Sequence, residues 1–152
     1  MDNEAIAERF MRLTTLMEIR GDDPFRILSY RNAAEMIESW PTPLKTIAAE
    51  QGAKGLQTLP GVGKAISGKI MELLEKGTFD AWEKLTAETP ETTLDLLKVG
   101  GIGPRTAATL HRQFKIASLD DLKEFAAGGG LELVDGIGER IAERIKDSLE
   151  RM

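Results

Sequence analysis

Apolar residues recur at intervals of three or four positions along most of the chain, which is the spacing of one face of an α-helix. The first stretch with this spacing carries four of them: Ile6, Phe10, Leu13 and Met17. We therefore expect a helix from Asn3 to Arg20, followed by Gly21 just after its last turn. Either Asp2 or Asn3 can cap its first turn, because a short polar side chain accepts from the free amides there.

Prolines that follow a capping residue indicate the starts of two further helices. The first of these should start at Asp23-Pro24 and stop near Trp40-Pro41, and the second should start at Thr42-Pro43 and end at Gly52. Three glycines at 128–130 predict a flexible joint. No stretch alternates as a strand would, and aromatic residues make up only 5% of the chain. The expected fold is all-α, built from short helices, with further helices near 80–86 and 91–98. A last one should start at Ser118-Leu119-Asp120-Asp121, which has capping-box spacing with Asp in place of Glu, and end at the three glycines.

One short pattern occurs three times. Two glycines bracket an apolar residue, and a short apolar helix is expected to follow at once. The three copies, which we name the first, second and third hairpins, are LPGVGK at 59–64, VGGIGPR at 99–105 and VDGIGE at 134–139. Glycine adopts backbone angles that other residues avoid, so each pair lets the chain reverse sharply while the apolar residue points inward.

The hairpins have the chemistry of a phosphate site, because amides at the start of a helix lack internal partners and carry partial positive charge. In the first hairpin these amides belong to Gly61, Gly63 and Lys64. In the second they include those of Gly101 and Gly103. Such contacts would position a nucleic acid without reading its bases. The alternative is that each hairpin is simply a tight connector between helices.

Composition narrows the possible functions. The chain has no cysteine and a single histidine, His111, which excludes disulfides and thiolate or multi-histidine metal sites. No apolar run approaches the roughly 18 residues that span a bilayer, and MDNEAIAERF is unlike a secretory signal, so we expect a cytoplasmic protein without membrane contact. Net charge is −5, yet residues 56–115 carry 8 basic and 7 acidic side chains. A polyanion should therefore bind through local, directed donors.

The hairpins resemble helix-hairpin-helix motifs of DNA repair proteins. Together with EIRGDDPFRILSYRNAAEMIE at 18–38, they are similar to the N-terminal part of family X DNA polymerases, chiefly the bacterial ones. The resemblance implies a lyase-like domain over 1–78 and a second domain over 79–152 with the second and third hairpins. The catalytic domain that would follow has no counterpart, because the two Asp-Asp pairs fall at expected helix starts. We therefore expect no polymerase activity from these residues.

The same resemblance implies roles for particular side chains. Lys69 falls where lyase-active relatives form a Schiff base, although Ala65 replaces their second lysine. Arg26 matches a residue that holds a 5′ phosphate, and Tyr30 matches a tyrosine near the same pocket. Phe25 stands where some relatives stack a ring on a template base. The plainer alternatives are a solvated or phosphate-touching lysine at 69 and a core aromatic at 25.

Relatives can also hold a monovalent cation, Na⁺ or K⁺, on hairpin carbonyls that bridge it to a DNA phosphate. By position, the corresponding carbonyls here are those of Gln57, Leu59, Val62, Leu97, Val99 and Ile102. Backbone carbonyls are hard oxygen ligands and suit such ions.

The favoured function is DNA binding through the sugar-phosphate backbone, without sequence preference, on gapped, nicked or 5′-phosphate DNA in repair. The first and second hairpins would supply the amides, and Arg105 would add a cationic side chain beside them. Two alternatives come from other classes. One is a sugar-phosphate lyase that uses Lys69. The other is an interaction module in which the third hairpin, flanked by Asp135 and Glu139, docks a separate repair enzyme.

Overall fold

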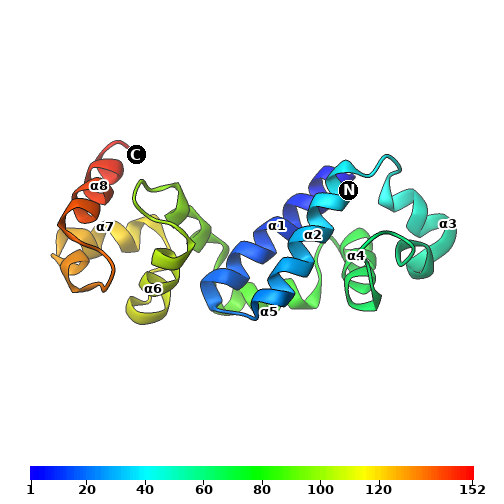
Figure 1. Cartoon of the computed structure of the whole chain (residues 1–152), viewed down its shortest axis with the longest axis horizontal. Coiled ribbons are helices and arrows are strands. Elements are labelled where there is room, and N and C mark those ends of the chain that lie inside the picture. The colour runs from blue at the N-terminus through cyan, green and yellow to red at the C-terminus, as the bar shows by residue number, and fades with distance from the viewer. The chain divides into compact units, whose positions relative to one another are not determined.

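The computed structural model describes all 152 residues, and every regular element in it is helical (Figure 1). This confirms the all-α prediction. None of the helices combines the length and the apolar character that crossing a bilayer requires. The elements are α1 (Asn3–Arg20), α2 (Pro24–Ser39), α3 (Leu44–Leu56), α4 (Lys64–Lys76), α5 (Asp80–Glu88), the 3-10 helix η1 (Glu91–Lys98), α6 (Pro104–Phe114), α7 (Leu119–Ala127), the 3-10 helix η2 (Gly130–Leu133) and α8 (Glu139–Glu150).

The chain divides into two compact units. The first unit consists of residues 1–14 and 23–85, and the second consists of residues 15–22 and 86–152. The first unit therefore holds the first hairpin, and the second unit holds the other two. The domain boundary after residue 78, which the sequence resemblance implied, stays a prediction.

Helices α1 and α2 begin and end as the sequence predicted. The amide of Ala5 donates to the Asp2 carboxylate at 2.8 Å, which satisfies one of the free amides of the first turn. At the other end, Gly21 takes a left-handed φ of +89°, and its amide donates to the carbonyl of Met17 at 2.9 Å. The Asp23 side chain then caps α2 by accepting from the amide of Phe25 at 3.2 Å.

Aromatic rings form the centre of the first unit. Phe10 is fully buried, and its ring stacks on those of Tyr30 and Phe79 with centroids 6.2 and 5.7 Å away. Trp82 is also buried, and the guanidinium carbon of Arg9 lies 4.9 Å from its ring centroid. The core thus holds α1, α2 and α5 together and fixes the position from which Tyr30 extends.

Helix α3 does not end at Gly52, as the sequence suggested. Gly52 takes φ +65° and ψ −157°, which kinks the helix, and the chain then makes another turn to Leu56. The extra turn forms because Leu56 is fully buried in the first unit. The first hairpin follows directly from this buried anchor.

The second unit has one aliphatic core, which contains apolar residues of both the second and the third hairpin. Ser118 caps α7 by accepting from the amide of Asp121 at 3.1 Å, and the Asp121 carboxylate accepts from the amide of Ala117 at 3.0 Å. The Ser118 cap was predicted, whereas the Asp121 carboxylate bonds the amide one residue before the one that a capping box uses. The buried residues of the aliphatic core are Ile19, Leu96, Val99, Ile102, Ala107, Leu110, Ile116, Leu122, Leu131, Val134, Ile137, Ala142, Ile145 and Leu149.

The three glycines at 128–130 do not form the flexible joint that the sequence suggested. Gly130 is buried at the start of η2, and a Cβ there would lie 2.4 Å from Cε1 of Phe125. The glycine is needed because the Phe125 ring packs against its backbone. Gly130 therefore packs closely against α7 just before the third hairpin.

Candidate nucleic-acid interface

The three hairpins share one backbone geometry. The middle apolar residue is buried in each, with exposed fractions of 5% for Val62, 6% for Ile102 and 8% for Ile137. Its amide donates to the carbonyl three positions earlier, at 3.1 Å in the first hairpin and 3.2 Å in the other two. The expectation that this residue points inward is confirmed. Each turn is anchored by its apolar residue, and the second glycine of each is exposed.

The two glycines of a hairpin differ in what requires them. The first adopts left-handed angles, with φ of +76° at Gly61 and +92° at Gly101, which other residues adopt at a cost. The second has ordinary extended angles, with φ of −98° at Gly63 and −102° at Gly103. A Cβ on either second glycine would meet no atom within 4 Å. Neither backbone conformation nor internal packing therefore explains a glycine at 63 or 103.

Helix α4 begins with free amides beside this open space. The first hydrogen bond into the helix runs from the amide of Ser67 to the carbonyl of Gly63, at 3.0 Å. The amides of Gly61, Gly63 and Lys64 donate to no backbone carbonyl, and no side chain caps the helix. All three residues are exposed. These donors are accessible to a ligand, as the amide hypothesis requires.

The second hairpin provides fewer free donors. The residue that corresponds to Lys64 is Pro104, which has no amide hydrogen. The amide of Gly100 already donates to Oγ of Ser148 at 2.8 Å. Gly101 is only half exposed, because a Cβ there would lie 3.1 Å from Cγ1 of Ile145. Gly103 stays exposed, as does the Arg105 side chain next to it.

Three further residues singled out by resemblance lie together in the first unit. Nζ of Lys69, on α4, lies 5.5 Å from the centroid of the Tyr30 ring, on α2. Burial acts to raise the pKa of the Tyr30 phenol, but hydrogen bonding to Arg26 and Lys69 and their positive charges outweigh it, so the pKa is lowered overall. The arrangement forms a positively charged surface next to α4.

Phe25 lies at the start of α2 and is 80% exposed. The reading that placed it in the core is wrong, since the ring contacts mainly solvent. An exposed aromatic ring is available for stacking on another flat group.

The third hairpin has the same backbone but different surroundings. Its second glycine, Gly138, also has open space around it. Asp135 and Glu139 flank the turn and are exposed, so two carboxylates lie beside the free amides. Leu133, just before the turn, is 71% exposed. The local charge opposes phosphate binding at this hairpin.

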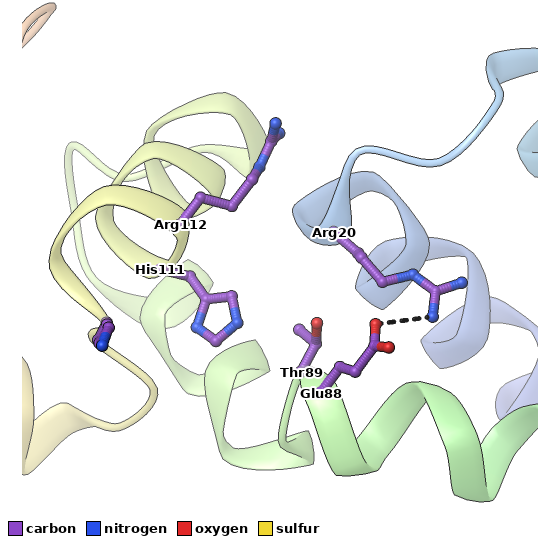
Figure 2. A pocket seen from close by; sticks show the side chains of 6 residues that line it. Arg20, Glu88, Thr89, His111 and Arg112 are labelled. Carbon is purple, nitrogen blue, oxygen red and sulfur yellow. Dashed lines mark hydrogen bonds and ion pairs between the residues drawn. The ribbon is translucent and has the colours of Figure 1, made fainter.

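A cluster of basic side chains, of which the sequence analysis named His111 alone, lies in the second unit around a cavity of about 340 Å³. Figure 2 shows Arg20, Glu88, Thr89 and His111 around this cavity. Arg20 forms an ion pair with Glu88, with 3.3 Å between Nη1 and Oε2. Arg20 also bonds to Asp22 at 2.6 Å, and this hydrogen bond is the main cause that raises the pKa of its guanidinium.

The role of this cluster is structural. Nε of Arg112 donates to the carbonyl of Ile19 at 3.1 Å, and Nδ1 of His111 lies 3.2 Å from the carbonyl oxygen of Ile116. The Arg112 guanidinium satisfies one of the last carbonyls of α1, where a positive charge also complements the helix dipole. His111 is half buried, not a plain surface residue. His111 and Arg112 lie in the last turn of α6.

Comparison with known families agrees with this geometry. The sequence matches the family described as a helix-hairpin-helix domain over residues 1–79, and the family described as a SAM-like helix-hairpin-helix tandem over residues 93–151. The chain belongs to the helix-hairpin-helix domain family.

Curated relatives confirm the resemblance to family X DNA polymerases. The chain is 27% identical to the DNA polymerase/3′-5′ exonuclease PolX of Bacillus subtilis (strain 168), over 98% of this chain and 25% of that protein. It is 30% identical to DNA polymerase lambda of Arabidopsis thaliana, over 99% of this chain and 28% of that protein. It is 31% identical to the human DNA-directed DNA/RNA polymerase mu, over 80% of this chain and 23% of that protein. The chain thus spans about a quarter of the length of these relatives.

Proposed function

We propose that this protein binds the sugar-phosphate backbone of DNA, without sequence preference, through the amides of the first and second hairpins. One observation carries the proposal. Gly63 and Gly103 have ordinary backbone angles and empty space where a side chain would lie, which leaves the exposed amides at these turns open to close approach by a ligand. Free amides at the start of a helix are suited to a phosphate oxygen. The polymerase relatives support DNA as the source of that phosphate.

The test is a titration of fluorescently labelled duplex DNA by anisotropy, at several salt concentrations. With about two to four phosphates engaged, the logarithm of the affinity should fall against the logarithm of salt with a slope of roughly −2 to −4. The variant Gly63→Val/Gly103→Val should lose binding and keep its helical circular dichroism, because the added side chains point into open space. An affinity that does not change with salt would contradict the proposal.

Gapped, nicked or 5′-phosphate DNA is the preferred form in this proposal. Arg26 and Lys69 lie together at the Tyr30 hydroxyl, where two cationic side chains can hold a terminal phosphate dianion. Phe25 is exposed on the same helix as Arg26 and can stack on a base at an interrupted strand. Duplexes with a one-nucleotide gap should bind more tightly when the gap carries a 5′ phosphate, and Arg26→Ala should remove that difference. Equal affinities for both duplexes would refute this preference.

The group formed by Arg26, Tyr30 and Lys69 favours a second candidate function, a sugar-phosphate lyase. The Lys69 amine would add to the C1′ aldehyde of an abasic sugar and release water. Loss of a C2′ proton would then expel the phosphate at C3′. Ala65, which replaces the second lysine of lyase-active relatives, argues for weak activity. Borohydride trapping of a protein–DNA adduct on abasic DNA, absent in Lys69→Ala, would establish it. No adduct with the unmodified protein would leave DNA binding alone.

A monovalent cation is proposed at the first two hairpins. The carbonyls of Leu59 and Val99 each accept one hydrogen bond within the turn, which leaves a second lone pair. The carbonyls of Val62 and Ile102 take no part in the backbone bonds of either hairpin. The remaining ligands would be the carbonyls of Gln57 and Leu97. DNA affinity at constant ionic strength should therefore be higher in K⁺ or Na⁺ than in a bulky quaternary ammonium salt.

The third hairpin is proposed to contact protein. Leu133 is largely exposed, and the carboxylates of Asp135 and Glu139 surround the turn beside it. A separate repair enzyme with a basic, partly apolar surface would complement it. Leu133→Asp should abolish such a complex and leave DNA affinity unchanged. Loss of DNA binding in this variant would instead place the third hairpin on the DNA.

A further inference from the structure

Helix α8 packs directly against the second hairpin. Oγ of Ser148 accepts from the amide of Gly100 at 2.8 Å. A Cβ on Gly101 would lie 3.1 Å from Cγ1 of Ile145 and 3.6 Å from Cγ2 of Ile141. The first hairpin has no such neighbour, since a Cβ on Gly61 would meet nothing within 4 Å. The second hairpin is therefore held in place by the helix that follows the third.

The outer face of α8 places arginines beside this contact. Arg140, Arg144 and Arg151 have the spacing i, i+4 and i+11, which puts them on one stripe of the helix. They line a cavity of about 380 Å³ that also includes Gly100. Nε of Arg144 lies 3.7 Å from the position of a Cβ on Gly100. At about 1.5 Å per residue the stripe is roughly 16 Å long, which is the length of several nucleotides along a strand.

These arginines are available to a ligand. All three are exposed, and the ion pairs of the second unit involve other residues, Arg20 with Asp22 and Glu88 and Lys98 with Asp95. The same cavity also includes Glu143 and Asp147, so its charged side chains sum to only one positive charge. Binding here would depend on the directed donors of guanidinium groups, which pair with phosphate in a fork geometry.

The second hairpin needs such donors more than the first. Pro104 removes the amide that Lys64 contributes in the first hairpin, and the amide of the half-buried Gly101 is less accessible than that of the exposed Gly61. The guanidinium of Arg144 lies next to this hairpin, with Nε 3.7 Å from the position of a Cβ on Gly100. The third helix-hairpin-helix element would thus act through its helix, while the carboxylates at its turn keep phosphate away.

We propose that Arg140 and Arg144, with Arg151 at the end of the stripe, bind the DNA phosphates adjacent to the one held by the second hairpin. The proposal rests on the proposed function and extends it. It assigns three side-chain contacts on α8 to the DNA and gives the second hairpin a composite site, made of amides from one element and guanidinium groups from another.

The test compares two double variants of the full chain on a gapped duplex. Arg140→Ala/Arg144→Ala should weaken binding by about tenfold or more and make the salt slope less steep by about 2, one for each lost phosphate contact. The control is Lys123→Ala/Lys146→Ala, which removes the same charge from exposed positions in the same unit. Lys146 points away from the stripe, so the control should bind within about twofold of the unmodified chain with the same slope. Equal urea midpoints would exclude unfolding as the cause.

The possible results separate this inference from the function on which it rests. If Gly63→Val/Gly103→Val loses binding and the arginine variant matches the lysine control, the α8 contacts are refuted and the hairpin function stands. If the unmodified chain does not bind the gapped duplex, both are refuted. A reduced slope in the arginine variant alone supports the composite site.

Discussion

The two glycines of the first hairpin should respond in opposite ways to the same substitution. Gly61 has φ +76° and Gly63 has φ −98°, and neither has any atom within 4 Å of its Cβ position. A methyl group therefore meets no packing obstacle at either site. Any effect of Gly61→Ala on stability must therefore come from backbone strain. Any effect of Gly63→Ala on DNA affinity must come from the added methyl group, which occupies space outside the hairpin that a ligand would use.

The magnitudes follow from the backbone angles. A left-handed conformation costs an L-residue about 1–2 kcal/mol, so Gly61→Ala should lower the free energy of unfolding by that amount. At Gly63 the angles suit any residue, and an alanine there reduces the freedom of the unfolded chain. Gly63→Ala should therefore leave stability unchanged or raise it by up to about 0.4–1 kcal/mol. Urea unfolding followed by circular dichroism would measure both values.

DNA affinity, unlike stability, should fall when Gly63 is replaced. A phosphate oxygen must approach an amide nitrogen to about 2.9 Å, and a methyl group at 63 projects into the open space from which it would come. Gly63→Ala/Gly103→Ala should thus weaken binding by about tenfold, equivalent to roughly 1.4 kcal/mol, while remaining as stable as the unmodified chain. The reasoning is refuted if Gly63→Ala destabilises the chain as much as Gly61→Ala, or if the double variant binds DNA with unchanged affinity.

Three further predictions concern the elements that support the site. Phe10→Ala should lower the free energy of unfolding by about 3–5 kcal/mol, because the ring is fully buried between Tyr30 and Phe79, and a loss under 1 kcal/mol would contradict this packing. Tyr30 is the only tyrosine, so tyrosinate absorbance reports it alone, and it should titrate below its ordinary pKa of 10.0 and move back toward that value in Lys69→Ala. Since its folded-state pKa lies below the unfolded one, ionised Tyr30 should add stability at pH above about 10, and this contribution is lost as pH falls through the folded-state pKa. A midpoint that does not move in Lys69→Ala would mean that the lysine does not act on the phenol. Ser148→Ala should cost about 1–3 kcal/mol of unfolding free energy because it leaves the amide of Gly100 without its acceptor, whereas Ser148→Thr should retain most of it.

Much of the fold could be read from the sequence because its signals act within a few residues. The caps at Asp2, Asp23 and Ser118 satisfy amides two or three positions away, and each was expected from the residue type and its place. The buried middle residues of the hairpins also followed from the local glycine pattern. Such contacts form wherever the chain turns into a helix, so distant residues have little influence on them.

The properties that decide the site depended on how distant segments pack. Tyr30 meets Lys69, and Gly100 meets Ser148, across separations that no local pattern encodes. The three hairpins look alike in sequence, yet only the second has covered glycines, because α8 packs against Gly100 and Gly101. Gly130 reads as a joint and is instead a contact with Phe125. Local residue types specify which turns and helices form, but the accessibility of an amide depends on which helix packs over it, and that is settled only when the whole core assembles.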